Sequence, residues 1–161
     1  MTLPLADPES EAAFNAALNT TRLISLAFAL SVGVFGVVVF VAELPGRTGF
    51  VPAFHGALTG VAALTAMFGL WFSRRPPPSV PGQLIKTPSA GARPEIVAAL
   101  NGLVMRTLVS LAAFEAVGMF GLVVAFTSGD PALFAPFAAA AWLLMATVVP
   151  RRELWRERLP D

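Results

Sequence analysis

The chain of 161 residues contains no cysteine and no tyrosine, and its only histidine is His55. Without cysteine, the protein has no disulfide, thiolate metal site, cysteine nucleophile or lipid-modified cysteine, and its redox compartment is left open. Charged residues make up only 13% of the chain, and the formal net charge is +1. This balance gives no reason to expect nucleic acid as a partner.

Hydrophobic residues, in contrast, make up 56% of the chain, and the mean hydropathy is +0.72. Four apolar segments are long enough to match a bilayer core of about 30 Å at about 1.5 Å per residue. They are residues 23–41, 50–72, 108–126 and 133–149. The sequence therefore predicts an all-α polytopic membrane protein with four transmembrane helices, whose first partner is the lipid bilayer.

Turn signals and proline divide the chain into three parts. Tight polar turns at 43–49 and 127–131 predict two antiparallel hairpins. Between them, residues 73–94 hold six prolines and four basic residues, which is typical of an extended, semi-rigid connector. The predicted parts are residues 1–72, with a lead-in and the first hairpin; 73–94, a cytoplasmic connector; and 95–161, with the second hairpin and a basic tail.

The lead-in, residues 1–21, is polar and acidic. Asp7-Pro8-Glu9 has the pattern of a helix start, with a capping carboxylate followed by proline at the first helical position. We expect this helix to form a solvated or interfacial extension of the first span. Because the segment lacks the basic region of a cleavable signal, we expect the first span to remain in the protein.

Basic residues predict the orientation. They gather in the connector and in the tail, whereas Arg47 alone lies in a turn on the opposite side. The positive-inside rule then places both termini and the connector in the cytoplasm, in our expectation at a bacterial inner membrane. Four residues are expected to anchor the helices at that interface: Arg22, Arg106, Trp71 and Trp155.

The third span repeats the first. With a shift of 85 residues, segments 23–41 and 108–126 share ten identities in nineteen positions, including the pattern V-G-x-F-G-x-V-V. The second and fourth spans match more weakly. We interpret the chain as two tandem hairpins in the same orientation, a parallel repeat.

Small residues at helical spacing predict close helix contacts in lipid. Two arrangements are open: packing inside one bundle, or a seam between copies of the chain. The residues concerned are Ser25, Ala29, Gly33, Gly36, Gly56, Gly60, Gly118 and Gly121.

Glu115 is the informative difference between the repeats, since Leu30 takes its place in the first copy. An acid near mid-membrane normally faces the bundle interior or water. It is a candidate proton or cation site, or else a protonated acid hydrogen-bonded to a carbonyl, serine or threonine. His55 is the second candidate, roughly 9 Å away along the membrane normal. A water could bridge the two side chains, and a haem-ligand role for His55 would require a second copy of the chain.

Residues 92–126 resemble part of the proteolipid (c-type) subunits of rotary ATPases. Arg93-Pro94 would stand for their polar loop, Glu115 for the ion-carrying carboxylate, and Gly118-Met119-Phe120-Gly121 for the glycine- and aromatic-containing stretch that follows. The resemblance implies proton carriage and assembly into a ring.

No metal motif, phosphate loop or catalytic constellation occurs in the sequence, so we expect neither an enzyme nor a cofactor. The leading hypothesis is a small non-enzymatic membrane subunit that forms a homo-oligomer or joins other membrane subunits. The alternative is a proton- or ion-conducting element centred on Glu115. A membrane enzyme or cofactor carrier ranks third.

Overall fold

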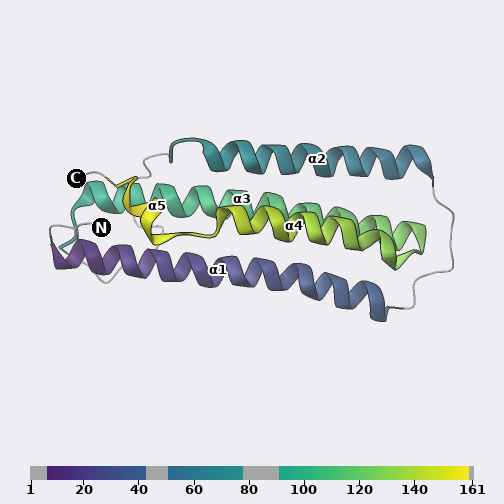
Figure 1. Cartoon of the computed structure of the whole chain (residues 1–161), viewed down its shortest axis with the longest axis horizontal. Coiled ribbons are helices and arrows are strands. Elements are labelled where there is room, and N and C mark those ends of the chain that lie inside the picture. Colours follow the sequence, from purple (N-terminus) through teal and green to yellow (C-terminus); the bar gives the residue numbers. More distant parts are fainter. Residues whose placement is uncertain (1–6, 43–50, 78–90, 160–161) are drawn as a thin grey trace.

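The computed structural model describes residues 7–42, 51–77 and 91–159, and these are helical without strands. The elements are α1 (Pro8–Val41), α2 (Pro52–Arg74), α3 (Pro94–Ser128), the 3-10 turn η1 (Pro131–Leu133), α4 (Phe134–Val148) and α5 (Arg152–Arg156). The four long helices alternate in direction, so α1 and α3 run the same way (Figure 1). The predicted turn 43–49, Phe50 and most of the proline-rich connector, 78–90, lie outside the described residues.

Local sequence explains where the helices begin and end. Asp7 caps α1 by accepting a hydrogen bond from the Ser10 N–H at 2.6 Å, as Asp7-Pro8-Glu9 predicted. Proline at the first helical position also opens α2 and α3. Helix α3 ends at Gly129, whose φ of 69° favours a residue without a side chain. The 3-10 turn η1 leads directly into α4, and together they form a span from Pro131 to Val148, which begins two residues before the predicted 133.

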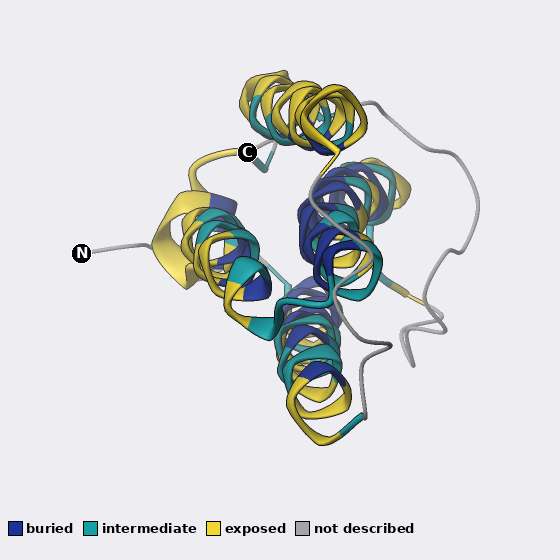
Figure 2. Ribbon diagram, turned by 90° about the vertical axis from the view of Figure 1, so that its right-hand side faces the viewer, coloured by how far each residue is buried: buried dark blue, intermediate teal, exposed yellow. Residues whose placement is uncertain are grey.

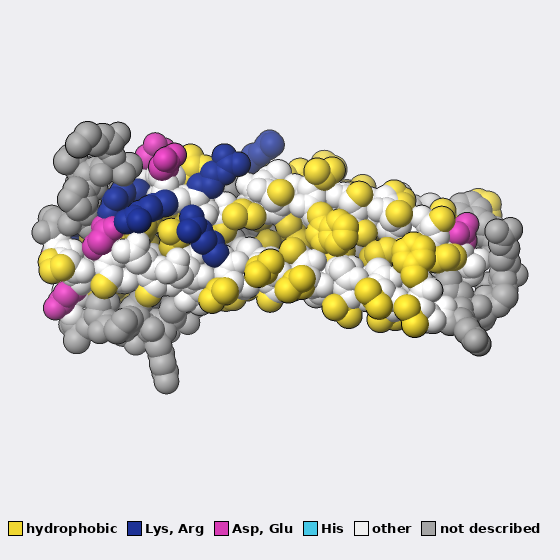
Figure 3. Space-filling model, turned by 60° about the horizontal axis from the view of Figure 1, so that its bottom comes forward, with side chains coloured by type: hydrophobic (Ala, Val, Ile, Leu, Met, Phe, Trp, Pro, Cys, Tyr) yellow, Lys and Arg dark blue, Asp and Glu magenta, His cyan; other side chains and the backbone are white. Residues whose placement is uncertain are grey.

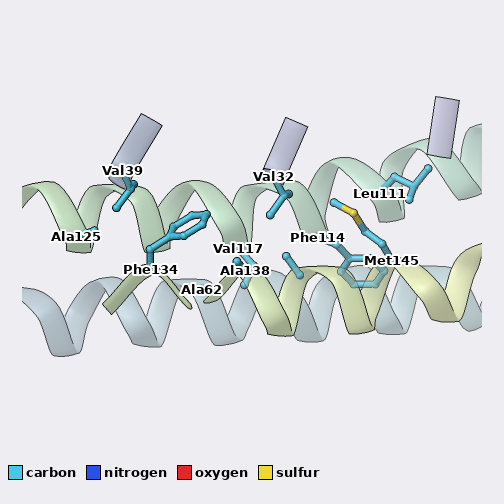
Figure 4. Packing of buried hydrophobic residues seen from close by; sticks show 11 residues of the cluster. Val32, Val39, Ala62, Leu111, Phe114, Val117, Ala125, Phe134, Ala138 and Met145 are labelled. Carbon is cyan, nitrogen blue, oxygen red and sulfur yellow. The ribbon is translucent and has the colours of Figure 1, made fainter. Parts of the chain in front are cut away.

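Helix α3 is the centre of the fold, because it packs against α1, α2 and α4. Half of its most apolar stretch is buried, compared with 17% to 22% for the other three helices. Exposed ribbon accordingly lies on the outward sides of the surrounding helices (Figure 2). The core along α3 contains Val32, Val39, Ala62, Leu111, Phe114, Val117, Ala125, Phe134, Ala138, Ala141 and Met145 (Figure 4).

A second core lies at the end of the molecule that holds both termini of the described chain. It joins the N-terminal turns of α1 and α3 to α5 and contains Ala13, Phe14, Ala17, Leu18, Ile96, Leu100, Leu103, Val104 and Trp155. One face of this part of α1 is therefore buried in the protein, so the segment, predicted as a solvated or interfacial extension, is not fully solvated. Its apolar face is covered by the start of α3, together with Trp155 of α5, a contact between segments far apart in sequence.

Four helices are long and apolar enough to cross a membrane, and we treat the protein as an integral membrane protein. Large apolar side chains are exposed on all of them, as lipid contact requires. On the face shown in Figure 3, basic side chains gather at one end, and the rest of the surface is mainly apolar.

The two hairpins are packed differently. Helices α3 and α4 are in contact along their length, whereas α1 packs against α3 and α4 but not along α2. Helix α2 rests mainly on α3 and meets α4 only slightly. The seam between α2 and α4 is therefore loosely closed.

Candidate functional site

Glu115 lies on the side of α3 that faces α1, where it is partly buried. The Ser31 hydroxyl of α1 is hydrogen-bonded to Glu115 Oε1. The same hydroxyl lies 2.7 Å from the backbone oxygen of Phe28, one turn earlier on α1. Both residues belong to the middle of their spans, so this polar contact crosses between helices at the least polar depth.

The single hydrogen of the Ser31 hydroxyl limits which hydrogen bonds can form at this contact. Ser31 has one hydroxyl hydrogen but two neighbouring oxygens, Phe28 O and Glu115 Oε1. Both hydrogen bonds form together when Glu115 carries a proton and donates it to Ser31 Oγ. If Glu115 is ionised, the Ser31 hydrogen turns to the carboxylate, and the extra bond to Phe28 is lost. The pair therefore has two hydrogen-bond arrangements that differ by one proton.

A third helix borders this contact. The indole Nε1 of Trp142 on α4 donates to the Ala29 carbonyl oxygen at 2.9 Å. A Cβ at Gly33 would lie 3.9 Å from the Trp142 ring, an ordinary van der Waals distance, so this part of α1 lies beside the ring. The carbonyls of Phe28 and Ala29 thus each accept a side-chain bond, and the Ser31–Glu115 contact lies where α1, α3 and α4 meet.

His55 belongs to a different place. It is 3% exposed near the start of α2. Its Nε2 lies 3.2 Å from Thr127 Oγ1, and its Nδ1 lies 2.9 Å from the Val51 carbonyl oxygen. Thr127 is twelve residues after Glu115 on α3, or about 18 Å along the helix axis.

Because His55 contacts α3 at Thr127, about 18 Å along the helix from Glu115, the structure does not bring His55 to Glu115. The expected bridged pair is not formed. His55 instead ties the start of α2 to the end of α3. No three His, Asp or Glu side chains in the described part of the chain lie close enough to hold a metal ion.

Most of the predicted packing residues meet another helix. A Cβ at Gly36 would lie 3.2 Å from Phe134, one at Gly118 would lie 3.3 Å from Val32, and one at Gly121 only 2.4 Å from Phe137 Cβ. Ala29 packs against the main core. Ser25 is buried and donates back to the Thr21 carbonyl of its own helix.

Gly56 and Gly60 are the exceptions. Both are exposed on α2, and a Cβ at either would have no described atom within 4 Å. Of the two arrangements left open by the sequence, packing inside one bundle is not found for this pair. The reason is that α2 presents the opposite side, with Ala62 and Gly69, to α3.

The four expected anchors separate into two kinds. Arg22 is exposed and reaches the Pro150 carbonyl, and Trp71 is half exposed with the Arg75 guanidinium 3.7 Å from its ring centre. Arg106 is instead 7% exposed and donates to the Arg75 carbonyl at 3.0 Å. Trp155 is 3% exposed inside the second core, so it does not lie at the surface as the predicted interface anchor would.

Sequence reasoning missed Ser31 and Thr127, the partners of the two candidate residues. Both are common hydroxyl residues within apolar helices, and only the register between helices identifies them. Comparisons of the chain with protein-family models, curated proteins and solved structures found no match.

Proposed function

We propose that this chain is a small non-enzymatic membrane subunit that assembles with copies of itself, or within a larger membrane complex, through the outward face of α2. Its place is a bacterial inner membrane, with both termini in the cytoplasm. The gathering of basic residues at the end where α1 and α3 begin supports this orientation.

One observation carries the proposal: Gly56 and Gly60 face outward from α2. Glycines four residues apart let two helix backbones approach closely in lipid, where packing rather than the hydrophobic effect drives association. The other predicted packing glycines already meet a neighbouring helix. Further along the same outward face are Leu64 and Trp71, which are 66% and 50% exposed. A second helix crossing at the glycines would cover this stretch.

The tandem repeat supports the same picture. The ten identities between 23–41 and 108–126 suggest a duplicated hairpin, and α1 and α3 run in the same direction (Figure 1). The copies have diverged in packing, since α4 lies against α3 while α2 lies away from α1. We propose that α2 lost its place in the bundle and became the assembly helix.

The absence of cysteine allows a direct test. Gly60→Cys introduces a unique thiol, and oxidation in native membranes is expected to join two copies through it. Val37→Cys is the matched control, since Val37 on α1 is 62% exposed, and it is expected to cross-link far less. If Gly60→Cys gives no dimer while maleimide labels it fully, α2 is not the seam between copies.

Proton carriage is the second candidate, and the Ser31–Glu115 contact favours it. The two hydrogen-bond arrangements of this pair differ by one proton, which is what a carrier of the proteolipid kind requires at its carboxylate. Glu115→Gln keeps the shape and the hydrogen-bonding groups but cannot release a proton.

The test is proton flux in liposomes with a pH gradient. If the protein carries protons through Glu115, the flux is expected to be lost in Glu115→Gln and mostly retained in Ser31→Ala. A wild-type protein whose flux equals that of Glu115→Gln has no carrier role at this site. Assembly measured on the same samples separates a conducting role from a structural one.

A further inference from the structure

A cleft of about 330 Å³ lies at the basic end of the molecule, where the ends of α2 and α4 meet α3 and α5. This volume falls in the range of about 300–1,000 Å³ that is usual for ligand pockets. No residue that lines the cleft is acidic. Four arginines line it: Arg74 from α2, Arg106 from α3, and Arg151 and Arg158 from the C-terminal tail.

The charge of these arginines is not balanced by other described side chains. Arg93 pairs with Asp7, and both Arg152 and Arg156 pair with Glu11. Within the same described residues, the four cleft arginines make no ion pair. Arg106 is almost buried, and it donates to a neutral group, the carbonyl oxygen of Arg75. A nearly buried guanidinium beside three others favours an anion.

The hydroxyl groups of the cleft do not compete for this role. Ser73, Thr107, Ser110 and Thr147 donate to the carbonyls of Leu70, Leu103, Gly69 and Leu144. Their hydrogens are therefore engaged, and hydrogen-bond donation into the cleft comes from the guanidinium groups. Planar guanidinium groups match the oxygens of a phosphate especially well.

An apolar groove of about 370 Å³ continues along the same seam. Helix α2 contributes residues 59–66 to the groove and 70–74 to the cleft, and α4 contributes 136–144 and then 147–149. Helix α3 forms the floor of both. Small side chains, among them Ala63, Ala66 and Ala140, keep the groove open.

The two hollows together have the dimensions of one lipid leaflet. From residue 59 to residue 74, α2 rises about 22 Å. One leaflet with its headgroups measures about 20–22 Å, half of a bilayer of about 40–45 Å. The basic cleft lies at the end of α2 and the apolar groove lies toward the middle of the same helix. A phospholipid has the same order, with its headgroup at the membrane surface and its acyl chains toward the middle of the bilayer.

We propose that this seam binds one anionic phospholipid, with its phosphate among Arg106, Arg151 and Arg158 and an acyl chain in the groove between α2 and α4. An anionic lipid is preferred to a zwitterionic one because no lining carboxylate can accept a choline or ethanolamine cation. Basic pockets between transmembrane helices on the cytoplasmic side commonly hold such headgroups. The site lies beside the Gly56–Gly60 face, not on it, so it stands independently of self-assembly.

Native mass spectrometry of the full chain in detergent tests the site, with phosphatidylglycerol and phosphatidylcholine of identical acyl chains. Phosphatidylglycerol is expected to bind at least tenfold more tightly. The paired variant of two exposed residues, Arg151→Gln with Arg158→Gln, is expected to lower its affinity about 25-fold, at about fivefold for each basic residue near a membrane surface. Arg152→Gln, the neighbouring arginine that pairs with Glu11, is the matched control and is expected to change the affinity less than twofold.

The source of the phosphate is tested separately with Ala63→Phe, which fills the groove, and with inorganic phosphate. A lipid site loses affinity for phosphatidylglycerol in Ala63→Phe, and excess inorganic phosphate displaces little of the lipid. The proposal is overturned if both lipids bind equally, or if the paired variant and Arg152→Gln behave alike. It is also overturned if inorganic phosphate binds as tightly as the lipid and Ala63→Phe has no effect, since the cleft would then be a soluble-anion site.

Discussion

Ser31 on α1 is hydrogen-bonded to Glu115 on α3, 84 positions later in the sequence, at the middle of both spans. This bond is one of several polar links between the two halves of the chain, and it lies about 18 Å along α3 from Thr127, the partner of His55. The contact makes Glu115 an interhelical residue, whatever further role its proton has.

Removing the Ser31 hydroxyl is expected to destabilise the bundle moderately. Polar side-chain pairs between membrane helices contribute about 0.6 kcal/mol on average and about 1.7 kcal/mol at most. We expect Ser31→Ala and Glu115→Leu each to lower the free energy of unfolding in mixed micelles. The double variant should lose less than the sum, because one bond is removed in both. Strict additivity would show that the two residues do not interact.

Gly121 is expected to tolerate no side chain. A Cβ there would lie 2.4 Å from Phe137 Cβ and 2.9 Å from its Cγ, so α3 and α4 would have to separate. Gly121→Ala should therefore cost about 1–3 kcal/mol of unfolding free energy, the usual cost of overpacking.

Gly56→Ala is the control for this prediction, since a Cβ there meets no described atom. It should leave stability unchanged or raise it slightly through helix propensity. Equal losses at the two positions would contradict the packing between α3 and α4.

The start of α1 is expected to depend on pH through Asp7. The Ser10 backbone N–H, together with the Ser10 side chain and Arg93, holds the pKa of the Asp7 carboxyl below its ordinary value. A lowered pKa means that the cap is fully present above about pH 4, the ordinary value, and is lost as the pH falls through the lowered value.

Amide exchange at Ser10 measures this cap. Protection is expected to persist at neutral pH and to fall in acid. Asp7→Asn keeps the capping geometry but removes the titration, so its protection should not vary with pH. The same pH dependence in Asp7→Asn would exclude Asp7 as the cause.

Glu11 is expected to hold α5 against the second core. Its carboxylate pairs with Arg152 at 2.7 Å and with Arg156, and Trp155 lies buried between these arginines in the sequence. In a background where Trp71 and Trp142 are phenylalanine, Glu11→Gln should shift Trp155 emission to longer wavelength as α5 loosens. Glu153→Gln makes the same charge change on α5 itself and should not. An unchanged spectrum in Glu11→Gln would mean that apolar contacts alone hold the tail.

Local signals predicted the ends of the helices but not the partners of their side chains. Asp7-Pro8-Glu9 predicted the start of α1 because capping involves residues within one turn. The apolar runs predicted the four long helices, and their C-terminal ends within two residues, but α1 and α3 begin about fifteen residues before the predicted spans 23–41 and 108–126. The burial of Trp155 was missed because it arises from contacts with residues of α1 and α3 that are far from it in the sequence.

The candidate site shows the same limit. An acid in an apolar span stood out at Glu115, but Ser31 did not, because serine is common in such helices. Gly56 and Gly60 have the four-residue spacing that is typical of glycines at helix–helix contacts in membranes. The sequence does not tell which side of α2 faces α3. The arginine cleft was not visible either, since its residues come from three separate segments of the chain.

The mass of the complex ejected directly from native membranes tests the assembly claim most directly. The account predicts a species larger than the 16.9 kDa chain, at a multiple of that mass or with further subunits, and a shift toward 16.9 kDa in Gly60→Leu. A wild-type protein found only at 16.9 kDa, or a complex unaffected by Gly60→Leu, would contradict assembly through α2.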